Sequence, residues 1–541
     1  MRWAAVCIAV VVALAGCGGS SHKHSTTTAD KTKTKTSATN RPAPAAKPIA
    51  VVDDVVVGGL GPEHMRIPIY DLRREGPYVV LDFGIKCLDQ TATGCNQELD
   101  FAAPSHSGEA VTANANTASG VKLVDPAGHK EYLPVRDSQN RPFDSLIPSL
   151  NDSLTHLAWV VFPAPPTSVT SIDVVFPNGG PQVPGIPISA SASPPTADAT
   201  MTAAKAAPFA AALGSSDTTG LTLPIENLVS TVGNPNGSDS ESASQDAITL
   251  RSDVLFHFAK SNLTSAAHSI LGRLAPQIKS RAIGPVKITG YTDSIGTDAV
   301  NIPLSNARAH SVVAALQPLT PGVSYESSGK GSNDPVAPNT KPDGSDNPAG
   351  RALNRRVTIV FSVKALSPPS PPPASAPAPA GAGTQGRTLN LTVKGGALTA
   401  HYQFTVNDLF REGDLVVLRM NLNCLSVTGQ ETARCDGETD LEGTPTVPPQ
   451  PQSVVSNEFN SISGFYLRDP ATGSEYIPLH DTDGLPLTSG VTTNLKVGAD
   501  YPQWIYFPAP PSSVSSVTLV APGGSTSLTD VPIGSSPPAQ P

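Results

Sequence analysis

Charge, aromatic residues and long apolar runs are all scarce in this chain of 541 residues. Charged residues make up 15% of it and aromatic residues 5%, whereas proline occurs 55 times. This composition predicts several modest domains joined by extended linkers, and it argues against one large hydrophobic core. The net charge of −9 argues against nucleic acid as a partner, because nucleic-acid binding needs a basic surface.

The only long apolar run, residues 3–15, lies at the N-terminus. It is too short for a standard membrane-spanning helix and is typical of a secretion signal. It leads into Leu-Ala-Gly-Cys at 14–17, which resembles the lipobox of bacterial lipoproteins. The resemblance implies a signal peptide over 1–16 and a lipid on Cys17, which would hold the protein on a membrane face without spanning it. The alternative is an ordinary signal peptide in which Cys17 has no role.

Cysteine is rare outside the N-terminal segment. The six cysteines are Cys7, Cys17, Cys87, Cys95, Cys424 and Cys435. The last four form two close pairs in a chain that we expect to be exported, which predicts the disulfides Cys87–Cys95 and Cys424–Cys435. No Cys-x-x-Cys motif or histidine cluster accompanies them, so we expect no metal site.

Low-complexity segments divide the chain. Residues 17–49 are polar and then Pro/Ala-rich, which predicts a disordered tether, and residues 366–387 form a Pro/Ala-rich spacer. The expected organisation is a signal peptide (1–16), the tether (17–49), a first β-sandwich (50–190), a linker (191–245), a central domain (246–365), the Pro/Ala-rich linker (366–387), a second β-sandwich (388–535) and a tail (536–541).

The two outer segments share a sequence pattern. YDLRREGPYVVLDFGIKCL near the start returns as NDLFREGDLVVLRMNLNCL near the end, so that Asp71 matches Asp408 and Cys87 matches Cys424. Short runs rich in Val, Ile, Leu and Thr, broken by Gly, Pro and Asp, predict strands. VVLDFGIKCL, VKLVDP, AWVVFP and SIDVVFP are examples. We therefore expect two copies of one antiparallel, immunoglobulin-like β-sandwich.

Two further features recur in both copies. Trp159 and Trp504 fall in register, and we expect them to be core anchors. Arg-Glu-Gly at 74–76 and 411–413 predicts a hairpin turn with a local ion pair. The copies share no paired carboxylates, histidine cluster or activated nucleophile, so we predict no catalytic residues in them.

The central segment alternates strand and helix patterns. Val254, Phe256 and Phe258 alternate as in a strand, and Asn301 is placed to cap the second helix. The expected order is β-α-β-α-β-β, a two-layer domain with two helices on one face of a sheet. The elements are expected at 251–263, 264–280, 284–293, 301–317, 323–335 and 355–363.

The same segment carries a series of motifs in a fixed order. They are G-Y-T-D at 290–293, N-x-x-L-S-x-x-R-A at 301–309, G-x-G at 329–331, P-x-A-x-N at 335–339 and G-R-A-L-N-R-R-V at 350–357. Together they resemble the OmpA-like C-terminal domain, a peptidoglycan-binding module of bacterial envelope proteins. The chain departs from that family's pattern at Ala259, often an acid or amide, and at Val300, commonly aromatic.

The resemblance implies that Asp293 and Arg308 grip meso-diaminopimelate in the stem peptide of peptidoglycan. The chemistry is consistent, because one end of diaminopimelate keeps an ammonium, which suits Asp293, and a carboxylate, which suits a forked guanidinium. Supporting roles are expected for Thr292, Asn301, Arg355 and Arg356.

These expectations combine into one hypothesis. The chain would be a non-enzymatic envelope lipoprotein that binds diaminopimelate-type peptidoglycan non-covalently, needs no cofactor and links the wall to the plasma or outer membrane. The sandwiches would be spacers or modules that bind a protein or glycan partner. One alternative is an adhesion or ligand-binding protein whose function resides in the sandwiches. A peptidoglycan-processing enzyme is less favoured, since candidates such as Asp71 and Glu75 lie at turns beside arginine.

Overall fold

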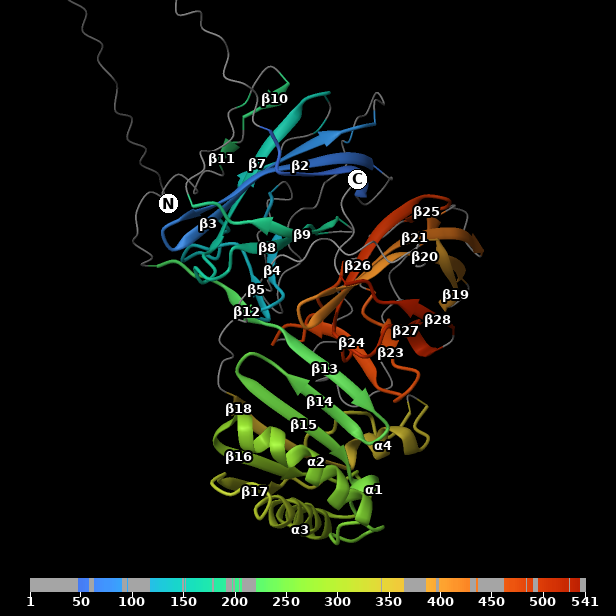
Figure 1. Ribbon diagram of the computed structural model, residues 1–541. Coiled ribbons are helices and arrows are strands. Elements are labelled where there is room, and N and C mark those ends of the chain that lie inside the picture. The colour runs from blue at the N-terminus through green and yellow to red at the C-terminus, as the bar shows by residue number, and fades with distance from the viewer. Residues whose placement is uncertain are drawn as a thin grey trace, which may run out of the picture. The chain divides into compact units, whose positions relative to one another are not determined.

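The computed structural model describes most of the chain between residues 47 and 535, and Figure 1 shows its strands and helices. Ala45–Pro541 form one compact unit by their mutual contacts. The expected signal peptide, with Cys17, lies outside the described residues. The described ranges are 47–57, 63–89, 95, 117–147, 150, 152–177, 180–190, 197, 200–203, 205–206, 220–341, 343–363, 386–395, 398–428, 434–435, 462–482, 484–489, 495–524 and 526–535.

Two sheets enclose one core in the first expected sandwich. The strands here are β1 (Ala50–Val57), β2 (Glu63–Glu75), β3 (Tyr78–Cys87), β4 (Lys122–Asp125), β5 (Lys130–Tyr132), β6 (Ser145–Leu146), β7 (Thr155–Pro163), β8 (Ser171–Val175), β9 (Gln182–Pro187), β10 (Met201–Thr202), β11 (Lys205–Ala206) and β12 (Ile225–Asn227). One sheet has the order β1-β2-β3-β7-β10, the other β12-β5-β4-β8-β9, and β6 pairs with β11. Phe83 and Phe176 meet edge to face in the shared core, with ring centroids 5.4 Å apart. Strands β1–β9 are named the N-terminal β unit below.

The second expected sandwich also has two sheets around one core. Its strands are β19 (Arg387–Gly395), β20 (Leu398–Glu412), β21 (Leu415–Thr428), β22 (Arg434–Cys435), β23 (Tyr466–Arg468), β24 (Glu475–His480), β25 (Leu495–Lys496), β26 (Asp500–Pro508), β27 (Ser516–Val520) and β28 (Ser527–Pro532). One sheet has the order β19-β20-β21-β26, β24-β23-β27-β28 lie next to one another in another sheet, and β22 pairs with β25. Strands β19–β28 are named the C-terminal β unit.

The Arg-Glu-Gly segments form tight hairpin turns between β2 and β3 and between β20 and β21, as expected. Gly76 has a φ of 61°, a conformation that favours glycine. A local ion pair is present in the first hairpin, where Nε of Arg73 lies 2.6 Å from Oε1 of Glu75. The arginines of the two Arg-Glu-Gly segments make other contacts. The guanidinium of Arg74 instead donates to the carbonyl oxygen of Pro165 at 2.6 Å, and that of Arg411 donates to the carbonyl oxygen of Pro510 at 2.7 Å. Each arginine therefore ties its hairpin to a remote proline-rich loop.

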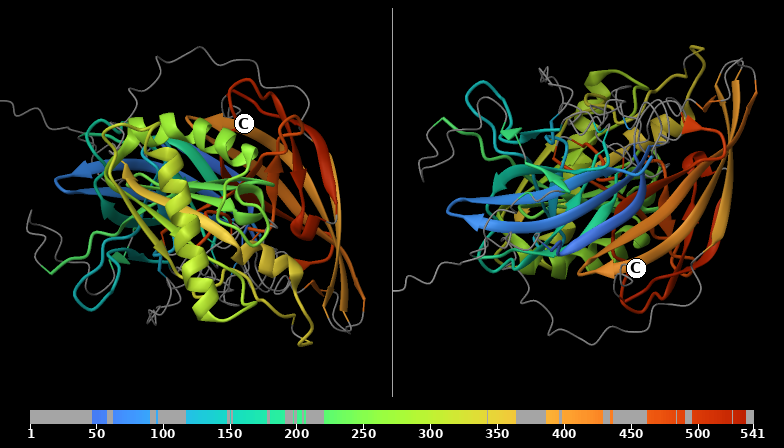
Figure 2. Two further views of the ribbon diagram at one scale, coloured as in Figure 1. Left: turned by 90° about the horizontal axis from the view of Figure 1, so that it is seen from below. Right: turned by 90° about the horizontal axis from the view of Figure 1, so that it is seen from above.

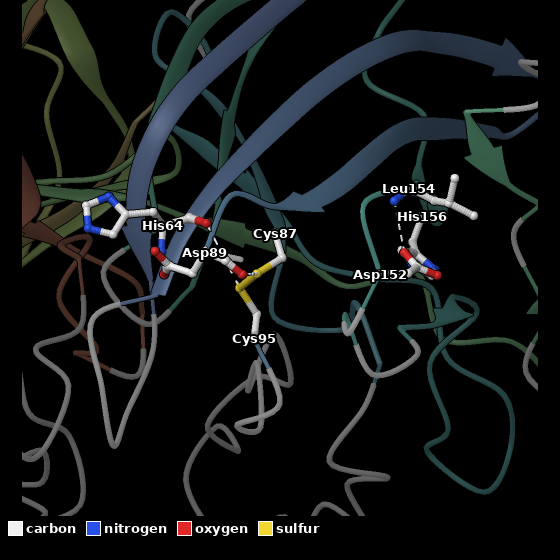
Figure 3. Close-up of a disulfide and its surroundings, with 7 residues drawn as sticks. All are labelled: His64, Cys87, Asp89, Cys95, Asp152, Leu154 and His156. Atoms are coloured by element: carbon white, nitrogen blue, oxygen red, sulfur yellow. Dashed lines mark hydrogen bonds and ion pairs between the residues drawn. A yellow bond between two sulfur atoms is a disulfide. The ribbon is translucent and has the colours of Figure 1, made fainter. Parts of the chain in front are cut away.

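Cys87 and Cys95 form a disulfide, which Figure 3 shows beside His64. Cys424 is also disulfide-bonded. The side chain of Cys435 lies outside what the structure describes, so the Cys424–Cys435 pairing stays a prediction.

Neither tryptophan lies in the core between the two sheets of its own unit. The expected role as a core residue is confirmed for Trp504, which belongs to a second buried apolar cluster, and is wrong for Trp159. Successive strand residues face opposite sides of a sheet. The inward positions are taken by their neighbours, Val160 and Ile505. Trp159 is half-buried on the outer face. Trp504 is buried, and its indole N–H donates to the carbonyl oxygen of Gly180, a residue of the N-terminal β unit, at 3.0 Å.

The central domain has a sheet packed against two long helices. Its elements are β15 (Gln245–Arg251), α1 (Ser252–Leu255), α2 (Ser265–Arg281), β16 (Ala282–Gly290), α3 (Asp298–Leu316), β17 (Tyr325–Gly329), α4 (Pro348–Asn354) and β18 (Arg356–Val363). The strand order is β17-β16-β18-β15, with β17 parallel to β16 and the other pairs antiparallel. In the view from below, the helices lie in front of these strands (Figure 2, left). The expected layers are present, with α1 and α4 as additions.

The expected strand at Val254–Phe258 is wrong, because the strand ends at Arg251 and one helical turn follows. Phe256 is buried, but the side chain of Phe258 is 97% exposed. The apolar residues at 254, 256 and 258 alternate in the sequence, but they lie in α1 and in the turn after it, not in a strand.

The segment expected as a linker at 191–245 contains three well-formed strands. They are β12, β13 (Val229–Asn234) and β14 (Gly237–Glu241). β12 pairs with β5 of the N-terminal β unit, and β13 pairs with β24 of the C-terminal β unit. β14 pairs with β15, so one ten-stranded sheet joins the central domain to the C-terminal β unit. The strand partners are remote in sequence, which explains why the local composition indicated a linker.

A first prediction concerns Asp246, whose side chain is fully buried on β15. Burial, and then the nearby charge of Asp239, raise its pKa to about 8. Because the pKa is higher in the folded than in the unfolded protein, the stabilisation is complete below about pH 4 and is lost as the pH rises toward 8. We expect Asp246→Asn to remove this loss, since each pKa unit corresponds to about 1.4 kcal/mol.

Calorimetric melting of wild type and variant from pH 5 to pH 9 checks this prediction. The variant should gain melting temperature relative to wild type as the pH rises. The exposed Glu326→Gln is the matched control and should follow wild type. A constant difference between Asp246→Asn and wild type over this range would contradict the assignment.

A second prediction concerns Ala259, which has a φ of 54° in the turn after α1. An alanine in this left-handed region costs about 1 kcal/mol, whereas asparagine tolerates it. We expect Ala259→Asn to stabilise the central domain by about 0.5–1 kcal/mol. In the same melting experiment, Ala266→Asn on the exposed face of α2 should destabilise by about 0.5 kcal/mol, because asparagine is a poor helix former. Equal effects of both substitutions would contradict this prediction.

Candidate functional site

Four segments of the central domain bring charged side chains together. They are α1, the loop after β16, the helix α3, and α4 with the residue that follows it. Strand β16 approaches α3 so closely that a Cβ at Gly290 would lie 2.2 Å from the carbonyl oxygen of Ser305. A Cβ at Gly329 on β17 would lie equally close, at 2.2 Å, to the amide nitrogen of Asn306. Only glycine permits this packing, which sets the loop after β16 beside the first turns of α3.

Asp293 lies in that loop with 12% of its side chain exposed. Its Oδ1 accepts a hydrogen bond from the amide of Ile295 at 3.1 Å. Its Oδ2 accepts one from Nη1 of Arg355 at 2.8 Å, and Nε of Arg351 lies 3.8 Å from the same oxygen. The carboxylate is therefore held in place by one backbone amide and by two guanidinium groups.

Arg308 is buried on α3. Its Nε donates to the carbonyl oxygen of Lys260 at 3.1 Å, and its guanidinium carbon lies 5.2 Å from the ring centroid of Phe256. Burial lowers its pKa, and the negative charges of Asp253 and Asp293 oppose that effect. Among the described residues, its two terminal amino groups have no hydrogen-bond partner. A buried arginine fork without partners can bind a carboxylate.

Thr292 and Asn301 are buried and shape the loop. The hydroxyl of Thr292 donates to the carbonyl oxygen of Asp293 at 2.9 Å, and its amide donates to the carbonyl oxygen of Gly331 at 2.8 Å. The amide group of Asn301 donates to the carbonyl oxygen of Ile295 at 3.1 Å. The expectation that Asn301 caps the helix is wrong, since α3 begins at Asp298, one turn earlier. Both side chains fix the loop that carries Asp293.

The two arginines of the R-R pair take different positions. Arg355 contacts Asp293, as described, and therefore belongs to the charged group. Arg356 is buried with its guanidinium carbon 3.7 Å from the ring centroid of Tyr291, and its Nη2 donates to the carbonyl oxygen of Asp334 at 2.9 Å. Among the described residues Arg356 contacts Tyr291 and the carbonyl oxygen of Asp334 and not Asp293, so it supports the neighbouring loops.

Two charged residues at the site were missed in the sequence. Arg351 lies in the G-R-A-L-N-R-R-V motif, from which no role for it was predicted. It forms an ion pair with Asp346, and its Nε lies 3.8 Å from Oδ2 of Asp293. Asp253 falls in the segment expected as a strand, but it lies on α1. Both of its oxygens bind one edge of Arg355, with Oδ1 3.0 Å from Nε and Oδ2 2.6 Å from Nη2. The contact of Asp253 spans about a hundred residues, and no local pattern indicates it.

Neither a metal site nor a membrane-spanning helix is found among the described residues. The described residues contain no group of three or more His, Cys, Asp or Glu side chains that could hold a metal ion. Within the same part of the chain, no helix has the length and apolar character needed to cross a membrane. The charged group around Asp293 and Arg308 is thus the candidate functional site.

Comparisons with known proteins place this site in a family. Residues 255–348 match the model of the OmpA family. The chain is 41% identical over 122 residues to "Photosystem I P700 chlorophyll a apoprotein A2" of Gloeobacter violaceus, covering 22% of this chain and 14% of that protein. It is 39% identical over 104 residues to "Peptidoglycan-binding protein ArfA" of Mycobacterium tuberculosis, covering 19% of this chain and 29% of ArfA. In both cases the match spans well under two thirds of the relative.

One solved structure is similar to 22% of this chain. The cell wall anchor of the T6SS from Pseudomonas aeruginosa is 30% identical, with a TM-score of 0.20, over 22% of this chain and 83% of that one. The motifs between Gly290 and Val357, the β-α layers and the family match all concern one segment. The central segment of this chain is an OmpA-like domain.

Proposed function

We propose that this chain is a non-enzymatic envelope protein whose central domain binds diaminopimelate-type peptidoglycan. The observation that carries the proposal is Arg308, a largely buried residue whose terminal amino groups have no hydrogen-bond partner among the described residues, beside the ordered carboxylate of Asp293. The peptidoglycan-binding name of the ArfA relative supports it. The photosystem name of the Gloeobacter relative is not carried over, because the match spans only 14% of that protein.

The arrangement suits one end of diaminopimelate. That end carries an ammonium and a carboxylate on one carbon, separated by a few ångströms. The carboxylate would accept two parallel N–H bonds from Arg308, and the ammonium would donate to the oxygens of Asp293. Such charge-assisted bonds contribute about 1.5–3 kcal/mol each. After the cost of association, a few of them give an affinity of about micromolar to millimolar for one stem peptide. Peptidoglycan presents many stems, which strengthens attachment to the mesh.

The remaining parts of the chain complete the proposal. A lipid on Cys17 would anchor the protein to a membrane, with all domains outside the cytoplasm. The two β units would be immunoglobulin-like sandwiches derived from one repeated domain, and they would act as spacers. The proposal for the repeat rests on the matched sequences and on equivalent registers, since Trp159 lies opposite Asp82 and Trp504 opposite Arg419, the residue that matches Asp82 in the aligned hairpins.

A third prediction tests the wall-binding site. We expect Asp293→Ala and Arg308→Ala each to weaken co-sedimentation with purified diaminopimelate-type wall by about tenfold or more, because each removes a charge-assisted contact. Arg308→Lys keeps the charge without the fork and should give an intermediate loss. Wild type should bind lysine-type wall poorly.

The matched control for this experiment is Arg273→Ala, an exposed arginine on α2. It should sediment with the wall as wild type does. Unchanged sedimentation of both site variants would refute the assignment of Asp293 and Arg308.

A fourth prediction tests the anchor. We expect Cys17→Ser to move the protein from the membrane fraction to the aqueous fraction in detergent phase separation, since the acyl chains would no longer be attached. Cys7→Ser should leave the partitioning unchanged, because Cys7 would leave with the signal peptide. Full membrane retention of Cys17→Ser would exclude a lipid on this residue.

A further inference from the structure

The charged site contains a second acid whose placement has a consequence for ligand selection. The guanidinium of Arg355 is shared between two carboxylates. One of its edges, Nε and Nη2, binds both oxygens of Asp253 at 3.0 and 2.6 Å. The bond from Arg355 to Asp293 comes from Nη1, at 2.8 Å. Arg355 therefore makes a two-point contact with Asp253 and a one-point contact with Asp293.

This division keeps Asp293 available. A guanidinium that is free of other partners pairs with a carboxylate through two parallel bonds and occupies both of its oxygens. Asp253 holds the Nε edge of Arg355, and in this orientation Asp293 receives a single bond from the guanidinium, through Nη1. Within the described part of the chain, its Oδ1 accepts a hydrogen bond only from the amide of Ile295, at 3.1 Å, and a carboxylate oxygen can accept more than one bond. Asp293 can thus still accept bonds from an ammonium.

Asp253 also balances the charge of the site. Two acids, Asp253 and Asp293, face two bases, Arg308 and Arg355, and Arg308 interacts electrostatically with all three of the others. The remaining base near Asp293, Arg351, has its own acid, Asp346. The site therefore has no net charge and contains separated positive and negative groups. Such a site fits a ligand that is itself a zwitterion, and it gives no net attraction to a simple anion.

We propose that Asp253 is a positioning residue that makes the site selective for a zwitterionic amino-acid end over an anionic one. The inference rests on the proposed function and names the ligand form that the same site takes. It predicts that a stem peptide with both the free ammonium and the free carboxylate of diaminopimelate binds, and that one with the ammonium masked binds poorly. Without Asp253, the site gains one positive charge and Arg355 can close onto Asp293, so this preference should disappear.

The test compares two soluble stem peptides by calorimetric titration of the full chain. One carries the free amino-acid end of diaminopimelate. The other is N-acetylated there, which removes the positive charge of the ammonium and leaves the carboxylate charge unbalanced. Wild type should prefer the first by about tenfold or more. Asp253→Asn should bind the zwitterionic peptide about tenfold more weakly while its affinity for the acetylated peptide is kept or rises, so that the ratio approaches one. Asp253→Glu, which keeps the charge, should restore part of the preference.

The outcomes separate this inference from the proposed function. If Asp253→Asn weakens both peptides by the same factor, or leaves the ratio at the wild-type value, Asp253 has no role in selectivity and the inference is overturned while the binding site stands. If wild type binds neither peptide, the proposed function falls and this inference with it. The side chain of Asp253 is 54% exposed, so we expect Asp253→Asn to fold, and the melting temperature of the same sample checks this.

Discussion

The close approach of strand β16 to helix α3 is the constraint on which the candidate site depends. Glycine at 290 and 329 lets two backbones meet where a Cβ would be only 2.2 Å from main-chain atoms of residues 305 and 306. The strand therefore ends beside the first turns of the helix, and the loop between them carries Asp293 toward the side of α3 that bears Arg308. A larger residue at Gly290 would push β16 away from α3 and so move Asp293 away from Arg308, although neither charged residue itself would be altered.

The charged side chains of the candidate site are stable there because each has at least one polar partner. Removing a charge from water costs several kcal/mol unless partners compensate it. Asp293 has Arg355, Arg355 has Asp253, and Arg308 has the carbonyl oxygen of Lys260. The network holds the side chains in position before a ligand arrives, so binding loses little side-chain freedom. The unpaired terminal amino groups of Arg308 are the exception, and they are the groups that a ligand carboxylate would satisfy.

The sequence predicted the parts of this site that are continuous along the chain. The motifs at 290–293 and 301–309 lie on one strand-loop-helix unit, and their resemblance to the OmpA-like pattern implied that Asp293 and Arg308 act together. Asp253 could not be found in this way, because its partner Arg355 is remote and the residues around it alternate as if in a strand. The same reason explains the linker expected at 191–245, where β12 and β13 depend on the distant partners β5 and β24. Local composition carries no signal for pairings of this kind.

The two β units have similar sequences, but they contact each other through different side chains. Asp173 of the N-terminal β unit accepts hydrogen bonds from the hydroxyl of Tyr506, at 2.5 Å, and from the side-chain amide of Gln182, at 3.0 Å. Burial raises the pKa of Asp173 and of its neighbour Glu412, although the hydrogen bonds that Asp173 accepts oppose its shift, so the pair holds a proton more readily than exposed carboxyls do.

The matched positions in the other unit cannot form this contact. In the Trp159–Trp504 register, the counterpart of Asp173 is Thr518 and the counterpart of Tyr506 is Val161. Each unit therefore supplies groups that the other lacks, and the contact joins two unlike surfaces. An interface between unlike surfaces, closed within one chain, leaves no equivalent surface free to add a second molecule. The two β units therefore contact each other through different side chains at positions that match in sequence.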